Sequence, residues 1–180
     1  MEVKQVEIPG LLIIQPDVFF DARGYFFESY NKEKFKNIGL DSEFVQDNQS
    51  MSAKGILRGL HFQNPPFAQG KLLSVIKGAV LDVAVDIRKA SESYGKYFSI
   101  ELSEENKTMF WIPPGFAHGF VSLHDNTIFS YKCTQVFNKS SEGSLRWNDP
   151  GLNINWGIEN PVISEKDQLA PFFVDLKSMF

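Results

Sequence analysis

Short runs in which apolar and polar residues alternate make up most of the chain, and Gly, Pro, Asn and Asp separate them. A period of two is typical of β-strands, because successive side chains of a strand point to opposite faces of the sheet. Strands are expected at residues 43–47, 56–63, 71–77, 79–87, 97–102, 108–112, 119–123 and 127–137. Many short strands at such spacing predict an all-β fold of the sandwich, jelly-roll or barrel type.

The ends of the chain add a few elements to this pattern. Near the N-terminus, the apolar runs "LLIIQPDVFF" and "YFFESY" flank "DARG", which is a turn-like break. The stretch "NKEKFKNIG" predicts a short helix with Asn31 as N-cap and Gly39 just past its end. With no internal repeat or linker, residues 1–180 are expected to form a single domain.

The run "AVLDVAVDIR" carries two different faces. One face holds only apolar residues, and the other holds mainly polar ones: Leu81, Val83, Val85 and Ile87 against Asp82, Ala84, Asp86 and Arg88. The pattern by itself favours an antiparallel strand with one face in water. The alternative is a strand whose polar face lines a ligand cavity.

Composition and charge exclude several classes of protein. The 180 residues are 43% hydrophobic and 22% charged, which is typical of a globular chain. Seventeen Phe residues suit aromatic-lined sheets or a ligand pocket. A net charge of -4 without a basic tract argues against nucleic acid as a partner. No apolar run is long enough to span a membrane, the N-terminal stretch "MEVKQVEIPG" lacks the pattern of a signal peptide, and one cysteine, Cys133, excludes an internal disulfide. A cytoplasmic protein is expected.

Polar groups cluster unexpectedly in "RGLHFQNPPFAQGK", residues 58–71. An unperturbed imidazole has a pKa of about 6.5, so His61 is a candidate base near neutral pH. Lys71 is a candidate for stabilising an oxyanion. Arg58 and Arg23 are candidates for binding phosphate, which the guanidinium fork binds well.

A histidine base needs a carboxylate to orient it, and three are candidates: Asp82, Asp86 and Asp167. In "SEKD", however, Ser164 and Asp167 match a capping box, so the residues alone favour Asp167 as the start of a short helix. Tyr131 in "IFSYKCT" is either a core aromatic or a proton donor.

The sequence predicts no metal site. It has three histidines, and His118 in "FWIPPGFAHGF" is the only one in a position comparable to a second ligand for His61. Two separated ligands are too few, because catalytic sites generally need three from the protein. His118 follows a tight turn and has small neighbours, so it either seals the end of a barrel or serves a site.

Taken together, these motifs identify a family. "FFDARGYFFESY", "FVQDNQSMS", "LRGLHFQNPP", "QGKLL", "GAVLDVAVDIRK", "WIPPGFAHGF", "YKCTQVF", "EGSLRWNDP" and "ISEKD" stand in the order and spacing of the dTDP-4-dehydrorhamnose 3,5-epimerases. The resemblance runs from about Pro16 to about Pro171 and is specific as a joint pattern. It implies a cupin-type jelly roll without metal or cofactor, and a homodimer that exchanges its N-terminal strands. The implied substrate is a dTDP-linked 4-keto-6-deoxy sugar.

The resemblance also implies roles for particular residues. His61 is then the base, Asp167 orients it, Tyr131 is the acid on the opposite face of the sugar, and Lys71 lies near the C4 oxygen. Further substrate-binding residues are implied in the cavity wall and around the nucleotide and diphosphate, some from the partner subunit: Arg58, His118, Phe19, Arg23, Glu28, Gln46, Asn48, Phe137 and Glu142.

Three points stay open on the sequence alone. Strict alternation places Arg58 and His61 on opposite faces, so both can reach a cavity only if Gly59 forms a bulge. The family often has two adjacent aromatics after the "YK" strand, whereas this chain has Val136 and then Phe137. Finally, a related enzyme could invert C3 or C5 alone, a ketoisomerase could move the carbonyl, and a non-catalytic cupin could bind the sugar nucleotide.

Overall fold

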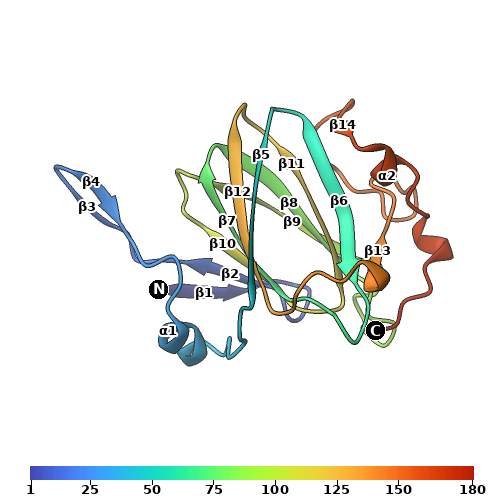
Figure 1. Cartoon of the computed structure of the whole chain (residues 1–180), viewed down its shortest axis with the longest axis horizontal. Helices are drawn as coiled ribbons and strands as arrows, with labels where there is room; N and C mark the ends of the chain where they lie inside the picture. The colour runs from blue at the N-terminus through green and yellow to red at the C-terminus, as the bar shows by residue number, and fades with distance from the viewer.

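Two six-stranded sheets and a separate two-stranded hairpin make up the computed structural model, which describes residues 1–180 (Figure 1). The first sheet has the order β1 (Glu2–Gln5), β2 (Leu12–Gln15), β10 (Met109–Ile112), β7 (Lys71–Lys77), β12 (Thr127–Cys133) and β5 (Gln46–Ser52). The second has the order β13 (Glu142–Ser144), β6 (Ile56–Gln63), β11 (Phe116–Ser122), β8 (Ala79–Asp86) and β9 (Tyr97–Ser103), and β14 (Val162–Ile163) pairs with β6. The predicted all-β, cupin-type sandwich is confirmed.

The sheets pack against each other through an apolar cluster contributed by both. Its members include Leu73, Val80, Phe110, Phe120 and Phe129, which are all buried. A second cluster lies on the outer face of the β6–β11–β8 sheet, where residues 145–180 cover it. A third joins the outer face of the first sheet to helix α1 (Lys32–Asn37). The outer face of the second sheet and part of the outer face of the first are thus covered as well.

The arrangement settles the environment of the two faces of β8. Val83 and Val85 point outward into the cluster under the C-terminal segment, while Val80 and Ala84 point into the sandwich. Asp82, Ala84 and Asp86 on the polar face are buried too, and only Arg88, just past the end of β8, is partly exposed, so the prediction of a wet face is wrong. The physical reason is the C-terminal segment, which covers the apolar face and leaves the polar face inside.

Three strand boundaries differ from the prediction. β5 runs over Gln46–Ser52 instead of 43–47, β11 begins at Phe116 instead of residue 119, and β12 ends at Cys133 instead of residue 137. The inward residues of β5 are polar, which hides its alternation from a hydrophobic pattern. β11 is extended by its ladder with β8, in which Phe116 pairs with Asp86.

Both short helices begin at the predicted caps. The Asn31 side chain accepts a hydrogen bond from the backbone N–H of Lys34 at 3.2 Å, and Gly39 takes a φ of +87° after α1. Helix α2 (Glu165–Gln168) begins after Ser164, whose hydroxyl accepts from the N–H of Asp167. The 3-10 helices Lys139–Ser141 and Phe173–Asp175 complete the secondary structure, and no helix is long and apolar enough to cross a membrane.

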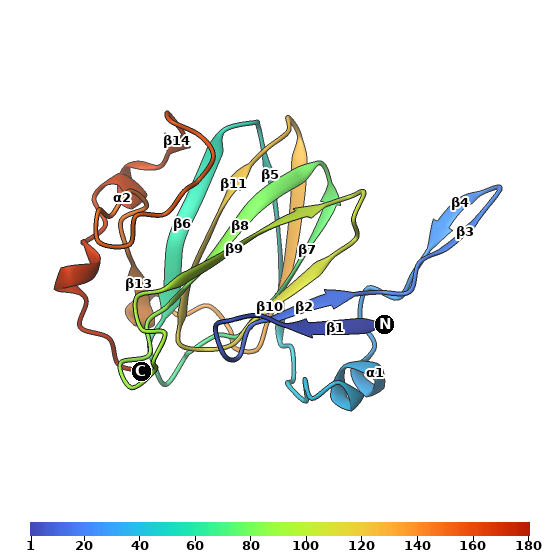
Figure 2. The same cartoon turned by 180° about the vertical axis from the view of Figure 1, so that it is seen from behind.

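The hairpin of β3 (Phe19–Asp21) and β4 (Gly24–Phe26) projects away from the sandwich (Figures 1 and 2). Four of its large side chains are more than half exposed: Phe19, Phe20, Tyr25 and Phe26. The Lys107 ammonium lies over the Tyr25 ring at 3.9 Å, but no other layer of the chain covers the hairpin. The aromatic N-terminal strands therefore remain largely unburied within one subunit.

A buried carboxylate at the end of β8 ties several loops together. Asp86 is fully buried and accepts hydrogen bonds from Arg88, Ser91 and Ser93, and Arg88 also donates to the carbonyl of Pro9. Burial raises the pKa of Asp86, but these hydrogen bonds lower it by more, and the net pKa is about 2.

We expect Asp86→Asn to lower the free energy of unfolding by roughly 2 kcal/mol at pH 7. The pKa of Asp86 lies below its ordinary value of 3.8, so its contribution is present above that pH and is lost as the pH falls through about 2. Urea titrations across this acid range should show the two proteins converging. A difference in stability that did not change with pH would contradict the assignment.

Candidate active site

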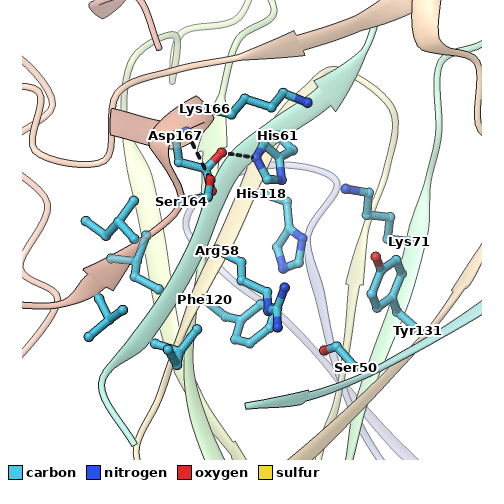
Figure 3. A pocket seen from close by; sticks show the side chains of 14 residues that line it. Ser50, Arg58, His61, Lys71, His118, Phe120, Tyr131, Ser164, Lys166 and Asp167 are labelled. Carbon is cyan, nitrogen blue, oxygen red and sulfur yellow. Dashed lines mark hydrogen bonds and ion pairs between the residues drawn. The ribbon is translucent and has the colours of Figure 1, made fainter. Parts of the chain in front are cut away.

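A cavity of about 510 Å³ opens on the inner face of the sandwich (Figure 3). Its polar lining comes from both sheets and from the C-terminal segment: Ser50, Arg58, His61, Lys71, His118, Tyr131, Ser164, Lys166 and Asp167. A neighbouring hollow of about 340 Å³ shares His61, Lys71 and Tyr131 with it. The second hollow continues to Gln46, Asn48, Gln63, Gln69, Phe137 and Glu142. The two together form one groove with His61, Lys71 and Tyr131 at its middle.

A bulge in β6 brings Arg58 and His61 to the same cavity. His118 pairs with His61, and Phe120 pairs with Arg58, so β6 holds one more residue than β11 over this stretch. Gly59 has a φ of +130°, and an added Cβ there would lie 2.5 Å from the Cα of Gly119. The predicted bulge at Gly59 is confirmed, and only glycine fits it.

His61 is paired with Asp167 on α2. The His61 Nε2 lies 2.6 Å from the Asp167 Oδ1, and the N–H of Gly59 donates to the other carboxylate oxygen at 3.4 Å. The backbone N–H of Asp167 donates to the Ser164 hydroxyl at 3.1 Å. The backbone N–H of Asp167 is thus a donor to the helix cap formed by Ser164, and its side chain holds His61, so the two interpretations of this residue are compatible.

The electrostatic setting keeps Asp167 ionised. Its side chain is almost wholly buried, which raises its pKa, but the hydrogen bonds from His61, Gly59 and Ser164 lower the pKa by more. An ionised carboxylate at this distance can orient the imidazole of His61. Of the other two candidate carboxylates, Asp82 pairs with His118 and Asp86 with Arg88, so neither orients His61.

Tyr131 and Lys71 face His61 from the other sheet (Figure 3). The Lys71 Nζ lies 6.0 Å from the centroid of the Tyr131 ring. Burial raises the pKa of Tyr131, so its phenol keeps its proton and can donate it. Burial lowers the pKa of Lys71, although nearby negative groups oppose this change. Tyr131 is therefore a lining residue of the cavity as well as a neighbour of the core residue Phe129.

His118 forms the wall between these two sets of residues. Its Nε2 lies 2.8 Å from the Asp82 Oδ2, and its ring stacks near Phe120 and Phe129 at centroid distances of 6.5 and 6.3 Å. Each of the two cavity histidines is thus paired with its own carboxylate. No group of three or more His, Cys, Asp or Glu residues is placed to hold a metal ion.

Three predicted substrate-binding residues lie away from the cavity of their own chain. Phe19 and Arg23 are on the projecting hairpin, and Arg23 is paired only with its neighbour Asp21. Glu28 pairs with Lys34 beside α1. Their positions follow from the hairpin, which extends away from the sandwich and does not fold back over it.

The structure also adds residues that the sequence did not single out. Lys166 lines the cavity, and its Nζ lies 2.6 Å from the Glu142 carboxylate. The Ser50 hydroxyl is buried in the cavity wall without a hydrogen-bond partner. Its parity with Gln46 and Asn48 along β5 would have placed it on the same face. For Lys166, the only available signal was its position next to Asp167.

Comparison with known proteins places the chain in a family. The sequence model described as dTDP-4-dehydrorhamnose 3,5-epimerase matches residues 5–175. The chain belongs to the dTDP-4-dehydrorhamnose 3,5-epimerase family. The dTDP-4-dehydrorhamnose 3,5-epimerase of Shigella flexneri is 50% identical over 176 residues, which cover 97% of each chain.

Solved structures of relatives agree with this family and its fold. The dTDP-6-deoxy-D-glucose-3,5-epimerase of Legionella pneumophila, in complex with dTDP-4-keto-L-rhamnose, superposes with a TM-score of 0.91 at 45% identity. The match covers 95% of this chain and 92% of that one. A 3'-monoepimerase of Streptomyces bikiniensis, in complex with dTDP-quinovose, gives a TM-score of 0.88 at 30% identity, over 93% and 85% of the chains. The dTDP-sugar epimerase fold therefore serves one-centre as well as two-centre epimerases.

Proposed function

We propose that this protein converts dTDP-4-dehydro-6-deoxy-D-glucose to dTDP-4-dehydro-L-rhamnose by inverting C3 and C5. One observation carries the proposal: the His61–Asp167 pair and Tyr131 line one cavity from opposite sheets. Inversion needs a group that takes a proton from one face of the ring and a group that returns one to the other face. The protein is an isomerase by its family.

The first step is proton removal by His61. The ketone at C4 makes the protons on C3 and C5 acidic, because loss of either proton gives an enolate. His61 takes the proton, and the ionised Asp167 at 2.6 Å stabilises the resulting imidazolium.

The second step is proton return by Tyr131. Lys71 stabilises the charge on the enolate oxygen, an effect worth about 3 kcal/mol for one good donor in a dry site. The buried phenol of Tyr131 holds its proton until the enolate forms, and it delivers that proton to the opposite face. Between rounds His61 releases its proton to solvent and Tyr131 regains one from solvent, so two such rounds invert both carbons, and no step calls for a cofactor.

The rest of the groove suits a nucleotide diphosphate. Arg58 and Lys166 supply positive charge for phosphate, and Gln46 and Asn48 supply amide groups on β5. Phe137 is more than half exposed at the edge of the second hollow, where its ring can stack on a base. Glu142 lines the second hollow and is paired with Lys166.

The reaction in heavy water tests the proposal and its alternatives. Incubation with dTDP-4-dehydro-6-deoxy-D-glucose should incorporate deuterium at both C3 and C5, with inverted stereochemistry by NMR. Deuterium at one carbon alone would instead assign a one-centre epimerase, like the Streptomyces bikiniensis relative. Substrate binding without any exchange would assign a non-catalytic binding protein. Extensive chelation should leave the rate unchanged, and recovery of a lost rate by zinc, iron or manganese would overturn the metal-free mechanism.

The protein is also proposed to act as a homodimer in which each hairpin completes the partner's site. The exposed aromatic side chains of β3 and β4 support this, because one subunit leaves them uncovered. Phe19, Arg23 and Glu28 would then approach the nucleotide from the neighbouring subunit. The unpaired, buried Cys133 fits a cytoplasmic location.

Mixed dimers give a sharp test of this arrangement. Arg23→Ala should raise KM for the nucleotide sugar about tenfold or more, and His61→Asn should be inactive. Mixing the two variants should recover activity, because one site in each mixed dimer then has an intact His61 and an intact partner Arg23. Light scattering should give a dimer at micromolar concentration. A stable monomer, or no recovery on subunit exchange, would contradict the proposal.

A further inference from the structure

Asp82 is a buried carboxylate without enough partners. It is fully buried on β8, and its Oδ2 lies 2.8 Å from the Nε2 of His118. Its Oδ1 is also buried and has no hydrogen-bond partner in the chain. Asp86, farther along the same face of β8, provides a contrast, because hydrogen bonds satisfy both of its oxygens. A buried, half-satisfied carboxylate lowers stability, so Asp82 calls for a functional explanation.

Lys71 is a cation of the cavity without an ion-pair partner. It lines the cavity from the facing sheet, and it forms none of the ion pairs within 4.0 Å that the other buried charges make. The titratable and charged groups of the strands around it are Asp82, His118, His61, Arg58, Tyr131, Cys133 and Glu142. Burial lowers the pKa of Lys71, whereas the charges of Cys133, Asp82 and Glu142 raise it. Among these groups, Asp82 is the fully buried carboxylate.

The same carboxylate constrains His118. Burial lowers the pKa of His118, and the positive charges of Lys71 and His61 lower it further, whereas Asp82 raises it. A neutral imidazole next to a carboxylate donates its Nε2–H to that carboxylate. The Nδ1 then carries a lone pair, and no group of the chain donates to it. Since His118 lines the cavity, that lone pair is available to a ligand.

We propose that Asp82 is a positioning residue with two effects: it is the buried counter-charge that keeps Lys71 an ammonium, and it holds His118 as the neutral Nε2–H tautomer. The His118 Nδ1 then accepts a hydrogen bond from a hydroxyl of the bound sugar, and Lys71 alone carries the positive charge beside the enolate oxygen. This inference rests on the proposed function for the substrate and deepens it. Burial raises the pKa of Asp82, whereas His118 and Lys71 lower it.

Asp82→Asn tests the proposal, and Asp86→Asn is its matched control. Asparagine keeps the size of Asp82 and an oxygen for His118 but removes the charge. Without that charge, the pKa of Lys71 falls. As the pH rises, Lys71 therefore loses its proton, and the enzyme its turnover, at a pH about one unit lower than in the wild type. At neutral pH, kcat should fall about tenfold or more, with a smaller change in KM. Asp86→Asn removes an equally buried charge on the same strand outside the cavity, and it should leave the pH profile of kcat unchanged.

¹⁵N NMR of the protein labelled with ¹⁵N-histidine measures the tautomer of His118 without substrate. The chain has three histidines, so the spectrum is simple to assign with single His→Asn variants. Wild-type His118 should show a protonated Nε2 and an unprotonated Nδ1 at neutral pH. Asp82→Asn should mix the two tautomers, and Asp86→Asn should not.

The outcomes separate this inference from the proposed function. A wild-type His118 protonated on both nitrogens, or an Asp82→Asn variant with an unmoved pH profile, would overturn the inference. The wild-type spectrum tests the tautomer even if Asp82→Asn does not fold. If the spectrum is as expected but the wild type exchanges no deuterium into the proposed substrate, the function fails and the tautomer assignment stands.

Discussion

Replacing His61 with Asn is expected to abolish deuterium exchange at both C3 and C5, while the nucleotide sugar still binds. A positioned general base contributes about a hundredfold to ten-thousandfold to a rate, and no second base lies at this point of the cavity. Asparagine keeps a polar side chain of similar size, so the groove should retain its shape. Exchange is read by mass spectrometry of recovered substrate, and binding by calorimetry. His124→Asn is the control, because His124 is exposed and lies outside the cavity.

Asp167→Asn should be severely impaired as well, because the imidazolium of His61 loses its charged partner. The loss expected is about two orders of magnitude or more in kcat. The backbone N–H of residue 167 still donates to Ser164 in this variant, so the helix cap survives and the melting temperature should change little. A residue that served only as a helix cap would show the reverse: about 1 kcal/mol less stability and a near-normal turnover of the folded enzyme.

Tyr131→Phe is expected to separate proton exchange from inversion. His61 can still remove a proton in this variant, so the enolate forms at a reduced rate. With no acid on the opposite face, His61 itself returns the proton to the face from which it came. In heavy water, deuterium should enter C3 or C5 while the yield of epimerised product falls much further.

The control for this experiment removes a hydroxyl elsewhere in the sandwich. Tyr97 on β9 accepts a hydrogen bond from the N–H of Asn155, outside the cavity. Tyr97→Phe should leave both exchange and inversion intact. Mass spectrometry gives the deuterium content, and NMR gives the ring stereochemistry. A Tyr131→Phe enzyme that inverted as fast as it exchanged would show that another group is the acid.

Much of the fold could be predicted from the order of residues, because its signals are local. Alternation of side chains specified β6, β7 and β8 nearly to the residue, since a half-buried strand repeats every two positions. The cap at Asn31 needed only its own backbone neighbours. The joint motif pattern indicated the family, which the comparisons confirm, and it supplied the candidate His61, Asp167, Tyr131 and Lys71 before any geometry was known.

Other features depended on contacts between distant segments. The polar face of β8 lies inside because residues 145–180 cover its apolar face, and nothing within β8 itself encodes that cover. The bounds of β5 could not be predicted from hydrophobicity, because its inward side chains are polar and face a polar groove.

The geometry of the candidate site belongs to the tertiary structure. His61 and Asp167 lie 106 positions apart in the chain, and local pattern assigned Asp167 only to a helix cap. Their pairing follows from β14, which adds to β6 and carries α2 over the cavity. The sequence by itself determined which strands form, where the helices begin and which side chains can do chemistry. The family resemblance implied the His61–Asp167 pair, but only the tertiary structure placed these side chains 2.6 Å apart and paired Asp82 with His118, because such contacts depend on the packing of segments that no local pattern relates.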